Sequence, residues 1–241
     1  IVSVGGDGTI NEVVNGLHDG GGGDVSLGII STGTGSDFIR SIGLPPRYAD
    51  ACRRLLDSHR LLVDLGSVEY SVDGRREKRL FVNFAGLGFD AEVVRATTQR
   101  FKALGGLPSY LLGLLTTFLS YRNRDISLTI DGQTETRKLC TVVIGNGRYG
   151  GGSMLVAPDA DLSDGLFDVV TIGDISKPDL LWSLPRIYKG THLSHPKVNV
   201  IRTSEVTVDS VTGAFIQADG ELLGLTPARF TIIPSALNIL V

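Results

Sequence analysis

The sequence predicts an α/β unit followed by an antiparallel β-sandwich, with an open barrel as the alternative for this second part. In the first sixty residues an apolar run, a glycine-rich turn and an amphipathic stretch follow one another twice, the pattern of alternating strands and helices. From residue 61 onward short β-like runs are separated by turns such as Asp73-Gly74 and Asp131-Gly132, which are strong hairpin signals. We expect residues 1–60 to form a partial α/β domain and residues 61–233 to form the sandwich. The C-terminal residues, about 234–241, are a candidate for returning to the first domain.

Composition limits the class of protein. The chain has 241 residues, of which 42% are hydrophobic and 20% charged, so it can bury a core and is not disordered. Its 23 basic and 26 acidic residues give a net charge of −3, which argues against a dedicated nucleic-acid binder. Cys52 and Cys140 have no metal-site spacing, which favours a reduced, cytoplasmic compartment. The apolar stretch 107–121 is shorter than the roughly 20 residues of a membrane-spanning helix.

The first expected strand, residues 1–4, runs directly into the turn Gly5-Gly6-Asp7-Gly8-Thr9. After the turn, Ile10, Val13, Val14 and Leu17 recur at helical spacing. Backbone N–H groups at such a strand-to-helix turn suit phosphate oxygens, although the turn is neither a P-loop nor a GxGxxG motif. Because an apolar strand of this kind needs neighbours on both sides, we expect an N-terminally truncated chain.

A second glycine-rich turn, Gly33-Thr34-Gly35-Ser36-Asp37, follows the expected strand 25–30. Helices are expected after it, at about 38–42 and 48–58. Two such turns at the ends of adjacent strands would line one crevice, where ligands of open α/β sheets bind. A turn that merely joins a strand to a helix is the alternative.

The sandwich is expected to be interrupted by one helical insert, residues 91–121. Basic residues flank the apolar part of this insert: Arg95, Arg100 and Lys102 before it, Arg122 and Arg124 after it. Such a pattern suits contact with a membrane surface, and equally a helix pair packed on the sandwich. Free edges of the sandwich would also permit a strand-mediated homodimer.

Several motifs, in order along nearly the whole chain, resemble those of the diacylglycerol kinase catalytic domain family, lipid kinases that include sphingosine and ceramide kinases. The resemblance implies an incomplete three-layer α/β nucleotide-binding domain, of the kind NAD kinases share, joined to a β-sandwich. Two positions depart from the family pattern: Ser36 replaces the usual Asn, and Ser153 is inserted or substituted in a Gly-Gly-Gly-Met turn. The motifs are residues 5–16, 33–38, 83–90, 149–154, 157–160 with 164–165, 189–192 and 219–221.

The resemblance also implies site residues. Residues around the ATP phosphates would be Gly5, Gly6, Asp7, Gly8, Thr9, Asn11, Glu12 and Thr34, with Asp7 holding Mg²⁺ through water. Glu221 would act as general base on the lipid hydroxyl, assisted by Asp219. Proton acceptance and alignment are what phosphoryl transfer requires of such a carboxylate, although an Asp-Gly-Glu turn alone is more often a solvated hairpin.

A second cation is implied at the turn Asp161–Leu166. Asp161, Asp164 and Leu166 would supply carboxylate and carbonyl oxygens to a structural Mg²⁺, ligands that suit a hard cation. Without the resemblance the same residues read as an ordinary turn entering a strand.

Together these features predict an ATP- and Mg²⁺-dependent kinase that phosphorylates the hydroxyl of diacylglycerol or a related lipid at a membrane surface. An NAD kinase, which shares the first glycine loop and the two-domain plan, is the alternative enzyme. A non-catalytic relative that binds nucleotide or lipid is the alternative of another class.

Overall fold

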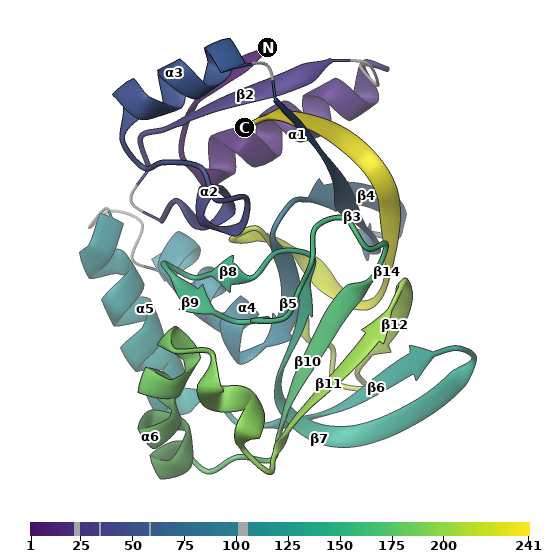
Figure 1. The fold of residues 1–241 in the computed structure, drawn as a ribbon. Helices are drawn as coiled ribbons and strands as arrows, with labels where there is room; N and C mark the ends of the chain where they lie inside the picture. The colour runs from purple at the N-terminus through teal and green to yellow at the C-terminus, as the bar shows by residue number, and fades with distance from the viewer. Residues whose placement is uncertain (22–24, 34, 58, 101–105) are drawn as a thin grey trace.

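The computed structural model describes residues 1–21, 25–33, 35–57, 59–100 and 106–241. Thr34 and Lys102, both expected to be functional, lie outside these ranges. In Figure 1 the α/β part lies at the top and the β-sandwich below it, with the remaining helices along one side.

The α/β part is a short parallel sheet covered by helices. Strand β1 (Val2–Gly5) pairs in parallel with β2 (Ser26–Ser31), and the helices are α1 (Asp7–Asp19), α2 (Asp37–Ser41) and α3 (Tyr48–Asp57). Apolar positions of α1, β2 and α2 meet in one core, in which Ile10, Leu27 and Phe38 are almost completely buried. This core fixes the two glycine turns at the carboxyl ends of β1 and β2.

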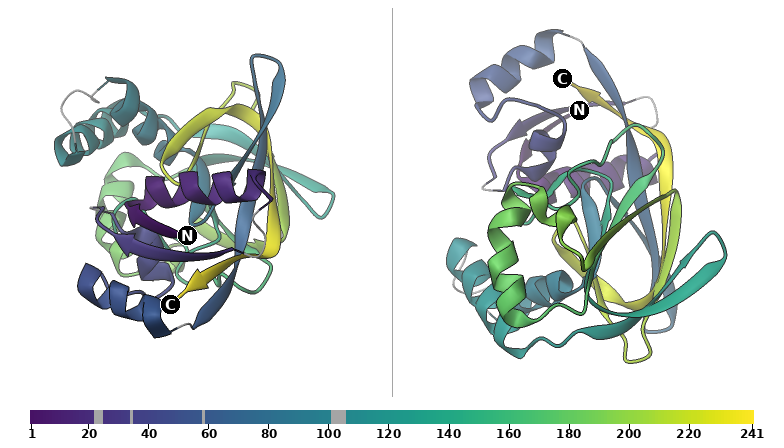
Figure 2. Two further views of the ribbon diagram at one scale, coloured as in Figure 1. Left: turned by 90° about the horizontal axis from the view of Figure 1, so that it is seen from above. Right: turned by 60° about the horizontal axis from the view of Figure 1, so that its bottom comes forward.

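Two long strands run through both parts of the molecule. Strand β3 (Arg60–Val72) pairs antiparallel with β14 (Glu221–Leu240), with register shifts in two places. The last residues of β14 then pair in parallel with β2, Asn238 opposite Ser26 and Ile239 opposite Leu27. The chain therefore ends as the neighbour of β2 in the first sheet (Figure 2).

The sandwich closes on itself through strand pairing. The path β14–β12–β6–β7–β5–β13 returns to β14, so these six strands form a ring rather than an open sheet. The expected Asp-Gly turns connect β3 to β4 and β6 to β7, and Asp73, Gly74, Asp131 and Gly132 all have positive φ. The strands not yet bounded are β4 (Arg75–Phe81), β5 (Phe84–Gly88), β6 (Arg124–Ile130), β7 (Gln133–Gly145), β8 (Tyr149–Gly150), β9 (Met154–Leu155), β10 (Phe167–Gly173), β11 (Val198–Thr203), β12 (Glu205–Asp209) and β13 (Phe215–Ala218).

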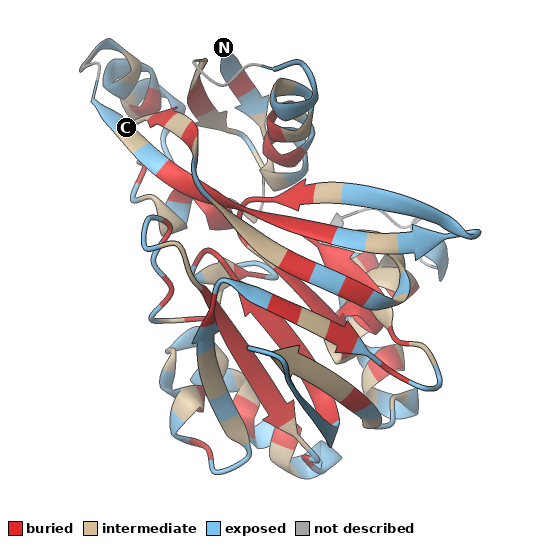
Figure 3. Cartoon of the chain, turned by 90° about the vertical axis from the view of Figure 1, so that its right-hand side faces the viewer, coloured by how far each residue is buried: buried red, intermediate tan, exposed pale blue. Residues whose placement is uncertain are grey.

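The sandwich core is built around three phenylalanines. Phe81 stacks on Phe167 with ring centroids 5.7 Å apart and meets Phe230 edge-on at 6.4 Å. Figure 3 shows buried positions along the middle of the strands and exposed hairpin tips. An α/β nucleotide-binding unit with an antiparallel sandwich, the expected fold class, is thus confirmed.

The helices of the sandwich differ in one respect from the expectation. The insert expected at 91–121 contains α4 (Phe89–Arg95), a π-helical turn (Ala96–Arg100) and α5 (Gly106–Ser120), but a further helix, α6 (Lys177–Tyr188), was not expected. A start signal for α6 is present in the sequence, since the Ser176 side chain accepts a hydrogen bond from the Asp179 N–H and a proline follows in the first turn. Along the described residues, each helix is too short or too polar to cross a bilayer.

Candidate active site

The two glycine turns lie in direct backbone contact. A Cβ atom added to Gly33 would lie 2.6 Å from the Cα of Gly6, and one added to Gly6 would lie 3.3 Å from the Cα of Gly33. The Thr32 N–H also donates to the Gly5 carbonyl oxygen at 2.9 Å. Only glycine permits this approach at Gly33, so the glycines bring the ends of β1 and β2 to one place, as the two-turn hypothesis requires.

Asp7 joins the first turn to the second. Its Oδ1 accepts a hydrogen bond from the Phe38 N–H at 3.0 Å, and its Oδ2 accepts one from the Asp37 N–H at 3.2 Å. A carboxylate is stabilised at the N-terminus of a helix, here α2. Each oxygen of Asp7 keeps a lone pair for a further partner. Beside it, Gly8 and Thr9 are exposed on the first turn of α1.

Asp37 continues this chain of contacts into the sandwich. Its two carboxylate oxygens accept hydrogen bonds from the Gly152 N–H at 2.9 Å and the Ser153 N–H at 2.6 Å. Gly151, Gly152 and Ser153 have positive φ, so this tight turn directs successive N–H groups at one anion. Burial raises the pKa of Asp37 although both hydrogen bonds favour the charged form.

Asp219 is a half-buried residue whose carboxylate is held by four donors. Its Oδ1 accepts from the N–H groups of Asn83 and Phe84 at 3.0 and 3.1 Å. Its Oδ2 accepts from the Val82 N–H at 2.7 Å and from the Asn11 side chain at 2.9 Å. Burial raises the pKa of Asp219 to about 6, against the opposing effect of these donors. At neutral pH the side chain is therefore an anion.

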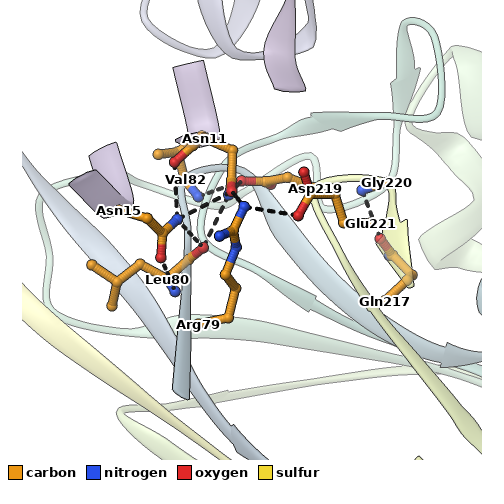
Figure 4. A network of polar contacts seen from close by, with 9 residues as sticks. All are labelled: Asn11, Asn15, Arg79, Leu80, Val82, Gln217, Asp219, Gly220 and Glu221. Atoms are coloured by element: carbon orange, nitrogen blue, oxygen red, sulfur yellow. Dashed lines mark hydrogen bonds and ion pairs between the residues drawn. The ribbon is translucent and has the colours of Figure 1, made fainter. Parts of the chain in front are cut away.

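Arg79 links Glu221 to helix α1 (Figure 4). One guanidinium nitrogen, Nη2, lies 2.8 Å from the Glu221 carboxylate and 2.9 Å from the Asn11 side-chain oxygen. Since Asn11 also donates to Asp219, the two carboxylates of the Asp-Gly-Glu turn are connected through Arg79 and Asn11. The Glu221 side chain remains 37% exposed, whereas both oxygens of Asp219 are already engaged by donors of the protein.

Other contacts of this network hold helix α1 against strand β4. Asn15 accepts from the Leu80 N–H and donates to the Leu80 carbonyl, which aligns α1 with β4. The buried Nε of Arg79 has no hydrogen-bond partner among the described residues. This N–H is one of the few buried donors that the fold leaves unsatisfied.

The turn that carries Asp219 and Glu221 is fixed from beneath. Gln217 is completely buried, accepts the Gly220 N–H at 2.9 Å and donates to Asp90 at 3.0 Å. Asp90 also accepts from the Thr141 hydroxyl at 2.7 Å, and burial raises its pKa. Asp219 and Gly220 both have positive φ, as Asp73-Gly74 and Asp131-Gly132 do, so the turn is a favoured two-residue hairpin turn to which Gln217 adds a further hydrogen bond.

Comparison with known proteins identifies the family of this site. Residues 1–68 match the diacylglycerol kinase catalytic domain, and residues 83–241 match the YegS C-terminal NAD kinase beta sandwich-like domain. A diacylglycerol kinase of Mycobacterium tuberculosis is 32% identical over 242 aligned residues, covering 100% of this chain and 76% of the relative. The chain belongs to the diacylglycerol kinase family of lipid kinases.

Other members of this lipid kinase family are similarly related. A Pseudomonas aeruginosa protein named as a probable YegS-like lipid kinase is 31% identical, with 99% of this chain and 75% of the relative aligned. A crystal structure assigned to the diacylglycerol kinases of Bacillus anthracis covers 100% of this chain and 77% of its own, with a TM-score of 0.74 and 25% identity. Yeast NADH kinase, at 12% identity and a TM-score of 0.54, covers 99% of this chain and 59% of its own and shows the shared fold.

The turn Asp161–Leu166 is arranged differently from the cation site that the lipid kinase resemblance implies. Asp161 Oδ1 accepts from the N–H and hydroxyl of Ser163, while Asp164 pairs with the Arg202 guanidinium and accepts the Leu166 N–H. A guanidinium thus already neutralises Asp164. Within the described ranges, groups of three or more metal-binding side chains are absent. The structural Mg²⁺ at Asp161, Asp164 and Leu166 stays a prediction, and a cation there would compete with Arg202 for the Asp164 carboxylate.

The structure brings most of the expected residues of this lipid kinase together. Gly5, Gly6, Asp7, Gly8 and Thr9 lie beside the second turn, and Asn11 contacts the Asp219–Glu221 turn. Glu12 is exposed on the same helix, and within the described part of the chain it makes no hydrogen bond or ion pair with the turn. Residues that the sequence did not indicate are Asp37, Arg79, Asn15, Asp90 and Gln217. Three of these residues stood within motifs, namely Asn15, Asp37 and Asp90, whereas Gln217 and Arg79, which lies in a basic run, gave no signal.

Proposed function

We propose that the protein transfers the γ-phosphate of ATP to the hydroxyl of diacylglycerol or a chemically related lipid. The observation that carries this proposal is the link from Glu221 through Arg79 to Asn11, because it holds a partly exposed carboxylate beside the helix whose N-terminus follows the glycine turn. The names of the relatives support a lipid acceptor. Residues of both domains would then line a single active site.

The nucleotide phosphates would lie against the glycine turns. The N-terminus of α1 and the closely packed turns offer backbone N–H groups to anionic oxygens without a side chain in the way. Asp7 has lone pairs free for water on Mg²⁺, so it fits a cation held mainly by water and phosphate, as this ion prefers. When bound, Mg²⁺ would neutralise charge on the transferred phosphate.

The acceptor hydroxyl would meet Glu221. A carboxylate within hydrogen-bond reach takes the hydroxyl proton as the oxygen attacks phosphorus. Arg79 fixes the position of Glu221. Asp219 would act as a positioning residue, since all four of its hydrogen bonds are made within the protein and it holds the turn on which Glu221 lies.

Transfer of label from radiolabelled ATP tests the proposal on the full-length protein. Diacylglycerol, phosphatidylglycerol, a sphingoid base and NAD are offered as separate acceptors, and label is expected in a lipid. Glu221→Gln is expected to lower kcat by roughly 10²- to 10⁴-fold, the usual contribution of a general base, and to leave ATP binding intact. Glu77→Gln, an exposed carboxylate on the same strand as Arg79, is the matched control. Label in NAD alone, or full activity of Glu221→Gln, contradicts the proposal.

A further inference from the structure

A cavity of about 670 Å³ lies apart from the glycine turns, between the π-helical turn, α5 and the start of β6. It is lined by Arg95, Arg100, Arg122 and Arg124, with Glu92 and Asp125 as the two carboxylates. The four arginines against two acids give the lining a net charge of +2, in a chain whose net charge is −3. Positive charge is thus concentrated here.

The arginines fall into two kinds. Arg95 and Arg124 are fixed, because each pairs with one oxygen of the nearly buried Glu92, at 2.7 and 3.0 Å. Arg100 and Arg122 are exposed and have no ion-pair partner in the part of the chain that the structure describes. Two guanidinium groups therefore remain available to an external anion at the rim of a cavity whose wall is already held in place.

Helix α5 exposes a leucine stripe directly beside the cavity. Leu111, Leu115 and Leu119, four residues apart, are 52%, 53% and 64% exposed. Thr116 and Ser120, which line the cavity, each follow one of these leucines by one residue, so the stripe and the cavity wall occupy adjacent faces of one helix. An apolar stripe bordered by basic residues is the arrangement of helices that lie in a membrane interface.

The neighbouring helix extends the apolar surface. The Lys177 ammonium donates to the Leu119 carbonyl at the end of α5, and Figures 1 and 2 show α5 and α6 on the same side of the molecule. Helix α6 exposes Trp182, which is 82% accessible. Tryptophan favours the headgroup level of a bilayer.

The cavity is separate from the proposed active site. Arg95 stacks over the ring of Phe215, the first residue of β13, at 4.8 Å, whereas Asp219 follows the last residue of that strand. A four-residue strand spans about 10 Å. A group bound by Arg100 and Arg122 would therefore not occupy the place of the hydroxyl that meets Glu221.

We propose that α5 and this arginine cavity form a bilayer-docking surface, in which the leucine stripe enters the headgroup–acyl boundary and the cavity binds the phosphate of an anionic phospholipid. The bound lipid is an anchor and not the molecule that is phosphorylated. The proposal rests on the proposed function only in that a lipid acceptor lies in a bilayer. The occupant follows from charge complementarity combined with the apolar stripe, since a bilayer presents anionic headgroups directly above an apolar layer that Leu111, Leu115 and Leu119 can enter.

Vesicle flotation without ATP tests the docking surface. The protein is mixed with vesicles of phosphatidylcholine alone, or of phosphatidylcholine with phosphatidylglycerol, and the double variant Arg100→Gln/Arg122→Gln is compared with wild type. Two basic residues near an anionic surface contribute about 1 kcal/mol each, so about 30-fold weaker binding to the anionic vesicles is expected. Leu115→Gln/Leu119→Gln is expected to weaken binding to both kinds of vesicle.

The matched control is Arg75→Gln/Arg76→Gln, which removes the same charge from exposed residues of the β3–β4 hairpin. Wild-type binding by the Arg100/Arg122 variant, or an equal loss in the control, overturns the proposal. Soluble glycerol phosphate is added to the vesicles at the concentration of accessible anionic lipid. Release of the protein from the vesicles also overturns the proposal, because the site would then recognise a free anion. Turnover of a dispersed short-chain diacylglycerol by the Arg100/Arg122 variant reports separately on the kinase function, which can fail while docking holds.

Discussion

Arg79 is the residue that makes the carboxylate turn part of one site with the glycine-loop helix. Its Nη2 contacts both Glu221 and Asn11, and Asn11 in turn donates to Asp219. Glu221 is more than a third exposed, so without this ion pair its side chain would sample several rotamers. A general base must be within hydrogen-bond reach of the proton that it takes. If Glu221 is the base, the rate of transfer therefore depends on the orientation of its side chain.

We expect Arg79→Gln to lower kcat by about 10- to 100-fold, the usual consequence of a misplaced catalytic group, while the KM for ATP changes little. Arg79→Lys should restore part of the loss, since an ammonium can pair with Glu221 but does not offer the second, fixed donor. Lys78→Gln, an exposed neighbour on β4, is the control. Steady-state kinetics at saturating lipid give both constants, and an unchanged kcat in Arg79→Gln would remove Arg79 from the mechanism.

At the scale of elements, Asp37 joins the α/β part to the sandwich. Its carboxylate at the start of α2 accepts hydrogen bonds from two N–H groups of the turn between β8 and β9. These two groups lie 115 and 116 residues further along the chain. Asp7 lies on the other side of the same helix start. The glycine turns are therefore linked to the sandwich through the start of this short helix, in addition to strands β3 and β14 that run through both parts.

Replacing Asp37 by Asn removes one acceptor and the charge, and hydrogen bonds to a charged group contribute about 1.5–3 kcal/mol. We expect Asp37→Asn to lower the free energy of unfolding by about 2 kcal/mol. Amide hydrogen exchange should rise at Gly152 and Ser153, and the KM for ATP should rise several-fold. Asp19→Asn, on an exposed position of α1, is the control. Unchanged exchange at the two amides would contradict the coupling.

Elements with a local signal were predictable, and elements set by distant partners were not. The glycine turns, the Asp-Gly hairpins and the insert at 91–121 follow from turn chemistry and spacing within a few residues. Strand β14 continues from Glu221 to Leu240 because β3 pairs along most of it, a tertiary effect that its own residues do not encode. The position of Arg79 opposite Glu221, 142 residues away, likewise depends on strand register.

At the scale of the whole molecule, three carboxylates with raised pKa values should make stability and activity depend on pH in opposite directions. Burial raises the pKa values of Asp37, Asp90 and Asp219, the last to about 6. A raised pKa means that the folded state binds the proton more tightly than the unfolded chain. The stability from these groups is complete below their unfolded pKa near 3.8 and is lost as pH rises through the folded pKa. The proposed reaction instead requires Asp219 as the anion that holds the turn.

The free energy of unfolding should therefore fall by about 3 kcal/mol through Asp219 between pH 4 and pH 6, about two pKa units at 1.36 kcal/mol each. The kcat should rise over the upper part of the same interval, with an acid limb near pH 6. Asp219→Asn is expected to be destabilised, because its amide meets N–H donors, but to show a flatter pH dependence between these limits. Burial lowers the pKa of His192, so this residue makes the free energy of unfolding rise with pH below pH 6.5. Because His192 is present in both proteins, the difference between the wild-type and Asp219→Asn slopes reports on Asp219 alone. Urea unfolding at several pH values measures the slopes, and equal slopes in wild type and Asp219→Asn would show that Asp219 titrates as an ordinary carboxylate.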